Sequence, residues 1–198
     1  MADIKLGYPN QASGFPFSEK QIDELMSTAF ECALNWTTKD GWAVGVMHVF
    51  VWHEGKVWLN FMGHRHRAAA IRRDPRVSVI VSSASAPPDA PQGQATLKGR
   101  VKFHDDDEEV RQWHYRMLAE KMCGGDKAAE DALVAKVTNP IRTVLEITPE
   151  KWITFDMAKM HAFEAGTDGG AYKQHLLSSD TVRLHAELAR RGLTLETD

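Results

Sequence analysis

The residues with the most unusual chemistry lie in the stretch VWLNFMGHRHRAAAIRRDPR, at positions 57–76. The first five residues have the β-branched and aromatic side chains of a strand, which Met62-Gly63 interrupts. His64, Arg65, His66 and Arg67 follow at the start of a short helix that ends before Pro75. A helix start offers free N–H groups and a partial positive charge, so these basic groups favour an anion site, most simply for phosphate. A solvated basic turn explains the same residues equally well.

Three further groups could take part in chemistry. His48 lies inside an apolar run, where it is either a core histidine with a satisfied hydrogen bond or a group beside a bound ligand. Lys98 and Arg100 are two residues apart and so lie on one face of a later strand, where they could meet an anionic substrate or water.

Two clusters have a metal site as their alternative interpretation. His64 and His66 form an H-x-H pair, but no carboxylate or cysteine has a spacing that would complete a metal site. Five consecutive acids at 105–109 suit the first turn of a helix, because consecutive residues on a helix point in different directions. We therefore expect no metal.

Composition narrows the class of protein. The chain of 198 residues has a net charge of −3 and a pI near 6.3, which argues against a nucleic-acid partner. Its two cysteines are far apart and have no metal-ligand spacing, so we expect no disulfide framework and a cytoplasmic location. No apolar run reaches the 18 or so residues of a membrane span, and the first residues do not resemble a signal peptide, so we expect no membrane partner.

Periodicity and turn residues predict the elements that position these groups. Six segments have the composition of strands: 33–38, 42–52, 57–61, 76–83, 94–103 and 141–156. Helices are predicted over 18–31, after the acids at 105–109, over 126–137 and over 178–191. The run WAVGVMHVFVW (42–52) has no helical period, so we expect one well-buried strand that pairs with 57–61 across a turn containing Gly55.

The distribution of these elements suggests one main domain. Residues 1–17 form a polar N-terminal arm, residues 18–160 the main domain, and residues 161–198 a C-terminal helical extension. Strands concentrated in one part of the chain, with helices outside that part, suggest a small barrel with helices packed on its outside.

The order of these elements resembles the FMN-binding split-barrel family, to which pyridoxamine 5'-phosphate oxidase and its relatives belong. The resemblance is carried by HEGKVWLNF, HRHRAAAIRRDPRVSVIVSS and QATLKGRV, and it covers roughly residues 20–155. It implies a mainly β fold of the α+β class, a six-stranded antiparallel split β-barrel with peripheral helices. Its most specific part is the pattern from Arg67 to Pro75.

The resemblance also implies a cofactor, FMN, and residues that bind it. Arg67, eight positions before Pro75, corresponds to the basic residue that binds the flavin phosphate, with His66 beside it. The strand before the basic turn and the strand before that one are implied to run along the cofactor, and a glutamine that opens a later strand often reaches it. The matching residues are Val46, Met47, His48, Val49, Leu59, Asn60, Phe61 and Gln94. The relatives are homodimers with each flavin at the interface, which would account for an apolar surface that includes Trp36, Trp42, Trp52 and Trp58, although most of these tryptophans suit an ordinary core.

The implied function is a flavin-dependent oxidoreductase that moves a hydride between the flavin and a small organic substrate. His48 and Lys98 are the candidate catalytic residues, and the sequence requires no protein acid or base. Oxidation of pyridoxine phosphate is not expected, because the run GVMHVFV has only one polar residue and the C-terminal segment lacks the substrate-binding Trp and Arg of that enzyme.

Two alternatives stay open. A deazaflavin coenzyme fits the same pattern, with a basic groove from Arg65 to Arg76 for a longer anionic tail. A non-enzymatic flavin or haem carrier is the other, with His48, His64 or His66 as the haem ligand.

Overall fold

The computed structural model describes residues 2–4, 14–170 and 178–195. Residues 1 and 5–13 of the predicted N-terminal arm lie outside the described residues, as do residues 171–177 and 196–198 of the predicted extension. The chain divides into two compact units, Phe17–Ile153 and a smaller one formed by Met1–Pro16 with Thr154–Asp198.

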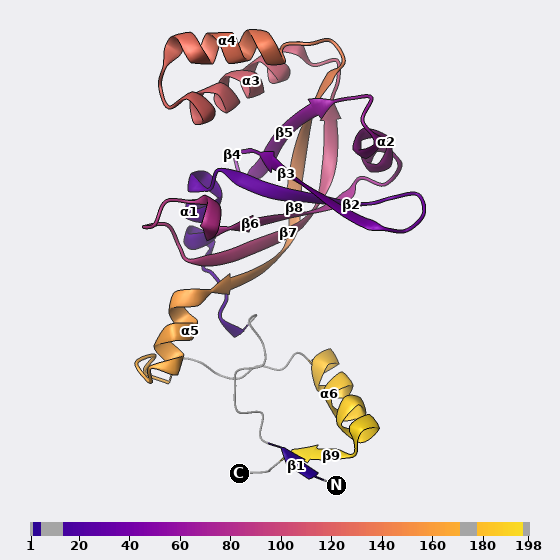
Figure 1. The fold of residues 1–198 in the computed structure, drawn as a ribbon, viewed down its shortest axis with the longest axis vertical. Helices are drawn as coiled ribbons and strands as arrows, with labels where there is room; N and C mark the ends of the chain where they lie inside the picture. The colour runs from indigo at the N-terminus through magenta and orange to yellow at the C-terminus, as the bar shows by residue number, and fades with distance from the viewer. Residues whose placement is uncertain (1, 5–13, 171–177, 196–198) are drawn as a thin grey trace. The chain divides into compact units, whose positions relative to one another are not determined.

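The larger unit is built on a curled antiparallel sheet of seven strands in the order β3-β2-β6-β7-β8-β5-β4 (Figure 1). The strands are β2 Glu31–Thr37, β3 Ala43–Val49, β4 Val51–His53, β5 Lys56–Met62, β6 Arg76–Ser82, β7 Gly93–His104 and β8 Arg142–Asp156. The sheet forms a half-barrel, so the predicted α+β split-barrel fold is confirmed.

The strand count differs from the predicted six because the apolar run at 42–52 is not one buried strand. It breaks at Phe50 into β3 and β4, which form the two opposite edges of the sheet. β4 pairs with β5 across the predicted hairpin, in which Gly55 has φ +70°, whereas β3 pairs with β2. Alternate residues of β3 face solvent, and the side chain of Met47 is 56% exposed. The prediction of a well-buried strand was therefore wrong, because an apolar edge strand and an apolar core strand have the same composition.

Four helices belong to the larger unit: α1 Glu19–Thr28, α2 His66–Arg73, α3 Glu108–Cys123 and α4 Lys127–Val137. α1 begins with the predicted capping box, in which Ser18 and Gln21 exchange side-chain-to-backbone hydrogen bonds. The acidic run starts α3 as predicted, with Asp107 accepting from the Val110 N–H, and Gly124 ends the helix in the left-handed conformation.

The strands separate two apolar clusters. Val57, Leu59 and Phe61 on β5 face the interior of the half-barrel, together with residues of α1 and α2. Trp58, on the other face of β5, packs against the α3–α4 pair. This alternation on β5 decides which of its residues can reach a site in the half-barrel.

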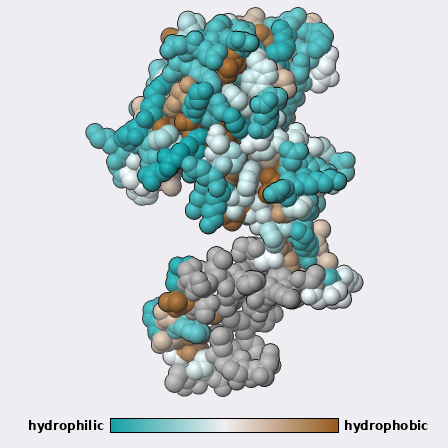
Figure 2. Space-filling model, turned by 180° about the vertical axis from the view of Figure 1, so that it is seen from behind, coloured by the Kyte–Doolittle hydropathy of each residue, from teal (hydrophilic) through white to brown (hydrophobic). Residues whose placement is uncertain are grey.

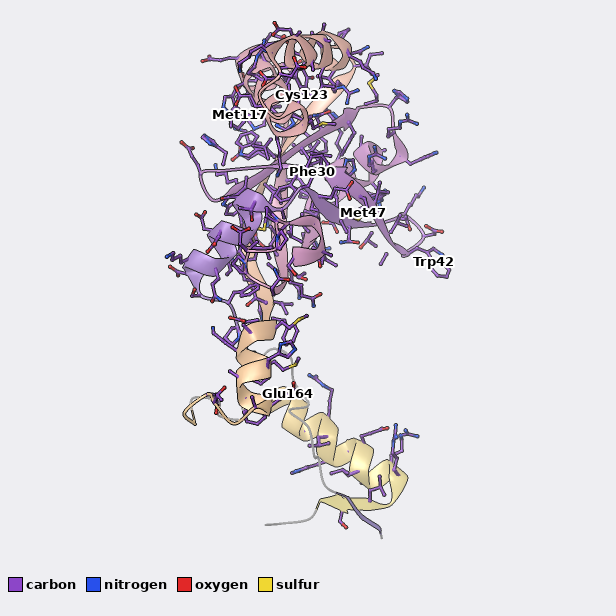
Figure 3. The ribbon with its side chains drawn as sticks, turned by 60° about the vertical axis from the view of Figure 1, so that its left-hand side comes forward. Phe30, Trp42, Met47, Met117, Cys123 and Glu164 are labelled. Atoms are coloured by element: carbon purple, nitrogen blue, oxygen red, sulfur yellow. The ribbon has the colours of Figure 1, made fainter. Side chains whose placement is uncertain are left out.

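The four tryptophans differ in exposure. Trp36 and Trp58 are buried, Trp52 is half-buried, and Trp42 at the β2–β3 turn is 70% exposed. Figure 3 shows Trp42 at the tip of this hairpin and Met47 further along it. The face drawn in Figure 2 carries mostly hydrophilic residues on the larger unit, with hydrophobic ones in separate spots.

The described residues of the smaller unit form two helices and a two-stranded parallel sheet. Its elements are β1 Ala2–Ile4, α5 Met157–Glu164, α6 Ser178–Arg191 and β9 Leu193–Leu195, and β1 pairs with β9. The Asp156 N–H donates to the Phe15 carbonyl (2.7 Å), and the rings of Phe15 and Phe163 lie 5.8 Å apart.

Both cysteines, Cys32 and Cys123, belong to the larger unit and are free. No helix among the described residues is long and apolar enough to cross a membrane.

Candidate cofactor site

The basic cluster is positioned by the tight turn between β5 and α2. The Gly63 N–H donates to the Ile141 carbonyl (2.7 Å), and a Cβ at Gly63 would lie 2.9 Å from the same oxygen. Glycine therefore lets the chain leave β5 close to β8 and begin α2 three residues later. Arg65 is the N-cap of α2 and makes no side-chain cap hydrogen bond, so no side chain of the cap occupies the first N–H groups and the partial positive charge of the helix start.

Arg67 lies on the first turn of α2 and folds back over β5. Its guanidinium carbon is 4.7 Å from the centroid of the buried Phe61 ring. The Nε atom of Arg67 is buried and has no hydrogen-bond partner among the described residues. Burial and the neighbouring Arg65 lower the pKa of Arg67, but an arginine stays charged in proteins. A half-buried guanidinium with an unused donor is a ready partner for an anion.

His48 completes the cluster from β3. Its ring lies 5.9 Å from the ring of Phe61, and its Nε2 atom is buried with no partner among the described residues. Burial, and to a smaller extent the charge of Arg67, lowers the pKa of His48 to about 4, so the imidazole is neutral near pH 7.

These three side chains meet across the opening of the half-barrel. β3 and β5 are not neighbours in the described sheet, yet His48 and Phe61 bring them together, and Arg67 covers the same ring from α2. Ala68 and Ala70 are buried, so α2 packs closely against the sheet. A phosphate monoester fits this group of residues, since it would pair with Arg67 and accept from the first N–H groups of α2.

The other predicted cofactor residues on β3, β5 and α2 occupy different environments. Val46 and Val49 are half-buried, and Met47 is exposed on the outer face. Leu59 and Phe61 belong to the apolar core of the half-barrel, and His66 is exposed at the first residue of α2.

Asn60 is directed away from Arg67. Its Oδ1 accepts from Arg142 Nη1 (2.6 Å), and its Nδ2 donates to His114 Nε2 (2.9 Å). His114 is fully buried, and burial followed by the charge of Arg142 lowers its pKa to about 3, so it is neutral and can accept at Nε2. The Asn60 side chain therefore links β5 to β8 and α3. Sequence reasoning missed His114 and Arg142, although strand alternation with Leu59 and Phe61 places Asn60 on the opposite face.

Gln94 and Lys98 lie on the outer face of β7, three strands from β3 in the sheet order. Lys98 lines a shallow cavity of 330 Å³ together with Asn35 and Ser78. The two candidate catalytic residues, His48 and Lys98, are thus on different faces of the sheet and do not meet within one chain.

The remaining arginines of the basic stretch are used in structural pairs. Arg72 donates two hydrogen bonds to Asp105 (2.8 and 2.7 Å), and Arg73 donates to the Thr37 carbonyl (2.9 Å). Arg76 pairs with Asp74. Only some of the basic groups in this stretch are therefore free to bind a ligand. The described residues contain no group of three or more His, Cys, Asp and Glu side chains that could hold a metal ion.

Several solved structures share this fold. A conserved hypothetical protein from Mycobacterium tuberculosis is 18% identical, with a TM-score of 0.65 over 75% of this chain and 90% of that one. An FAD-binding protein from Mesorhizobium loti is 16% identical, with a TM-score of 0.52 over 70% and 94% of the two chains. The haem-storage protein HutZ from Vibrio cholerae is 14% identical, with a TM-score of 0.51 over 70% and 96%. At these identities, the similarity shows the fold alone.

The family of this protein is shown by a comparison of its sequence with family profiles. No curated protein matches it, but the family profile described as pyridoxamine 5'-phosphate oxidase matches residues 19–156, which include the whole half-barrel, the basic turn and the α3–α4 pair. The chain is therefore a member of the pyridoxamine 5'-phosphate oxidase family.

Proposed function

We propose that this protein binds FMN, with the flavin phosphate at Arg67 and the start of α2, and that it is a flavin-dependent oxidoreductase. The observation that carries the proposal is the convergence of Arg67, Phe61 and His48 at the opening of the half-barrel, with two buried nitrogens lacking partners among the described residues. Membership of the family supports the proposal.

Each residue has a distinct role in this proposal. Arg67 pairs with the phosphate, and the Phe61 ring attracts the guanidinium that lies over it. His48 is a neutral group that can donate or accept one hydrogen bond toward the cofactor. When bound, FMN supplies the transfer of a hydride to or from a small organic substrate, so that the protein need only bind and orient the reactants.

A homodimer with the cofactor at the interface forms part of the proposal. β3 is an edge strand with exposed apolar side chains, and Met47 is continued across the outer face by Ile80, which is 37% exposed. Such an apolar face favours a second protein surface. In this arrangement, Gln94 and Lys98 act on the site of the second copy, since they lie three strands from β3 in their own chain.

The test is the visible spectrum of the purified protein, followed by titration with FMN. We expect flavin absorption or saturable binding of FMN, and we expect Arg67→Ala to weaken that binding by roughly tenfold to a hundredfold, the worth of a charge-assisted hydrogen bond. Arg72→Ala is the matched control, because Arg72 lies on the same helix but pairs with Asp105. A colourless protein that does not bind FMN in the titration, or equal effects of the two variants, would refute the proposal.

The same titrations separate the alternatives. The unpartnered Nε2 of the neutral His48 also suits a haem iron, which would give a Soret band that His48→Ala removes. A deazaflavin coenzyme would instead bind in preference to FMN and would need exposed basic groups such as Arg65 and His66 for its longer anionic tail. A carrier without enzymatic activity would bind its cofactor but would not turn over any reductant.

A further inference from the structure

A second cavity in the larger unit lies between α1, the β4–β5 hairpin and β8. Its volume is 450 Å³, and its walls include Glu19 and Asp23 from α1, Trp52 and Glu54 from the hairpin, and Trp152 from β8. None of the residues of the candidate flavin site lines it. The cavity therefore needs its own explanation.

Two indole rings form adjacent walls of this cavity. The rings of Trp52 and Trp152 are 6.1 Å apart and inclined at 73°, so they meet as two sides of a corner. Trp52 Nε1 donates to Asp23 Oδ1 at 2.7 Å, which fixes the orientation of its ring. Both indoles are half-buried, and each packs against the core while part of its ring stays accessible.

The charges around the indoles are predominantly negative. Glu19, Asp23 and Glu54 contribute three carboxylates to the lining. The one cation in the lining, Lys56, pairs with Glu146 at 2.5 Å, and that carboxylate offsets its charge. The cavity thus combines π-faces, which attract cations, with a lining that has more carboxylates than cations.

We propose that this cavity binds an organic ammonium ion. A quaternary or primary ammonium group would lie in the corner of Trp52 and Trp152, with Asp23 and Glu54 supplying the countercharge. A bare metal ion would not suit the site, because its carboxylates do not form one of the groups of three or more ligands that could hold a metal, and the described residues contain no such group. The proposal goes beyond the flavin function and does not depend on it.

The experiment is a titration of the full-length protein with choline, followed by the indole N–H signals in NMR spectra and by tryptophan fluorescence. We expect a saturable change at Trp52 and Trp152. The uncharged isostere of choline, 3,3-dimethylbutan-1-ol, should bind roughly fivefold or more weakly, because it lacks the charge. Equal binding of the isostere, or no saturable change with choline, would overturn the proposal.

Two variants test the countercharge. Asp23→Asn keeps an oxygen acceptor for the Trp52 N–H but removes the charge, and Glu54→Gln changes a turn residue whose side chain is 78% exposed. Each should weaken choline binding severalfold while FMN binding is unchanged. Asp131→Asn on α4, remote from the cavity lining, is the matched control and should leave choline binding as it is. If Glu54→Gln and a folded Asp23→Asn both bind choline as tightly as the native protein and the Asp131→Asn control, the carboxylates have no role and the proposal fails.

Discussion

Lys121 on α3 donates hydrogen bonds to the carbonyls of Phe50 (2.8 Å) and Ala29 (2.6 Å), and its Nζ lies 4.2 Å from the Phe50 ring centroid. Phe50 is the residue at which the apolar run divides into β3 and β4, and Ala29 ends α1. One side chain therefore fixes the sheet edge, the first helix and α3 relative to one another.

Replacing Lys121 by methionine removes these two hydrogen bonds while keeping the apolar stem. We expect the free energy of unfolding to fall by about 1–3 kcal/mol, because two buried carbonyls lose their donor. Burial lowers the pKa of Lys121 to about 8 from 10.5. Between these values the unfolded chain binds more protons than the folded one, so the native protein should gain stability relative to Lys121→Met as pH rises through this range. Urea denaturation below and within the range measures both effects, and a constant difference would contradict the assignment.

His48 should titrate far below an ordinary histidine. Its pKa is lowered to about 4 from 6.5, so the unfolded chain binds more protons between these values. The stability that the native protein has relative to His48→Gln should be fully present above pH 6.5 and decrease as pH falls toward 4. Phosphate bound at Arg67 would oppose this shift and raise the His48 pKa, which NMR titration with and without FMN can detect. A free-protein pKa near 6.5 would show that the ring is solvated.

Asn60→Ala distinguishes a structural role from a role in cofactor binding. The variant leaves the buried groups of Arg142 and His114 without their partner, so we expect a loss of about 1–3 kcal/mol in stability. The affinity for FMN should stay within about twofold of the native value, in contrast to Arg67→Ala. Thermal unfolding and FMN titration are the measurements, and a loss of FMN affinity with unchanged stability would reverse the conclusion.

Two glycines differ in what surrounds them. A Cβ at Gly99 would lie 2.4 Å from the backbone oxygen of Thr148, which is fixed in β8, whereas a Cβ at Gly45 would lie 2.3 Å from the side-chain oxygen of Asn35. Gly99→Ala should therefore cost about 1–3 kcal/mol, and Gly45→Ala less, because the Asn35 side chain can rotate away. Chemical denaturation of both variants tests this order, and equal costs would contradict it.

Met47→Glu tests the proposed homodimer. The substitution places a charge on the exposed outer face of β3 without touching the core, so the fold should persist while a dimer that buries this face dissociates. Sedimentation at several concentrations should report a monomer for the variant and a dimer for the native protein. Lys39→Glu, a charge change on the β2–β3 turn, serves as the control and should leave the dimer intact.

Local signals in the sequence predicted much of this structure. The capping box at Ser18, the turn at Gly55 and the pattern that ends at Pro75 each depend on a few neighbouring residues, and each lies where it was expected. The position of Arg67 at the start of a helix was predictable for the same reason. The family also follows from these patterns.

The errors concern interactions between distant parts of the chain. Hydrophobic periodicity cannot distinguish a core strand from an exposed edge strand, and so β3 was expected to be buried. Asn60 was expected beside the phosphate, but its partners, His114 and Arg142, are 54 and 82 positions away. Which arginines of the basic stretch are neutralised depends likewise on remote acids, such as Asp105 for Arg72.

The break at Phe50 has a mechanical consequence. β3 and β4 are the outermost strands of the sheet, yet they are consecutive in sequence and are joined through this residue. The two edges of the half-barrel are therefore joined covalently at one buried residue, and among the described strands no ladder of hydrogen bonds joins β3 to β5. A ligand bound between His48 and Arg67 would connect β3 to the side of β5 and α2, where no backbone hydrogen bonds connect them. Occupancy of the site should thus be measurable as a rise in melting temperature that grows with ligand concentration.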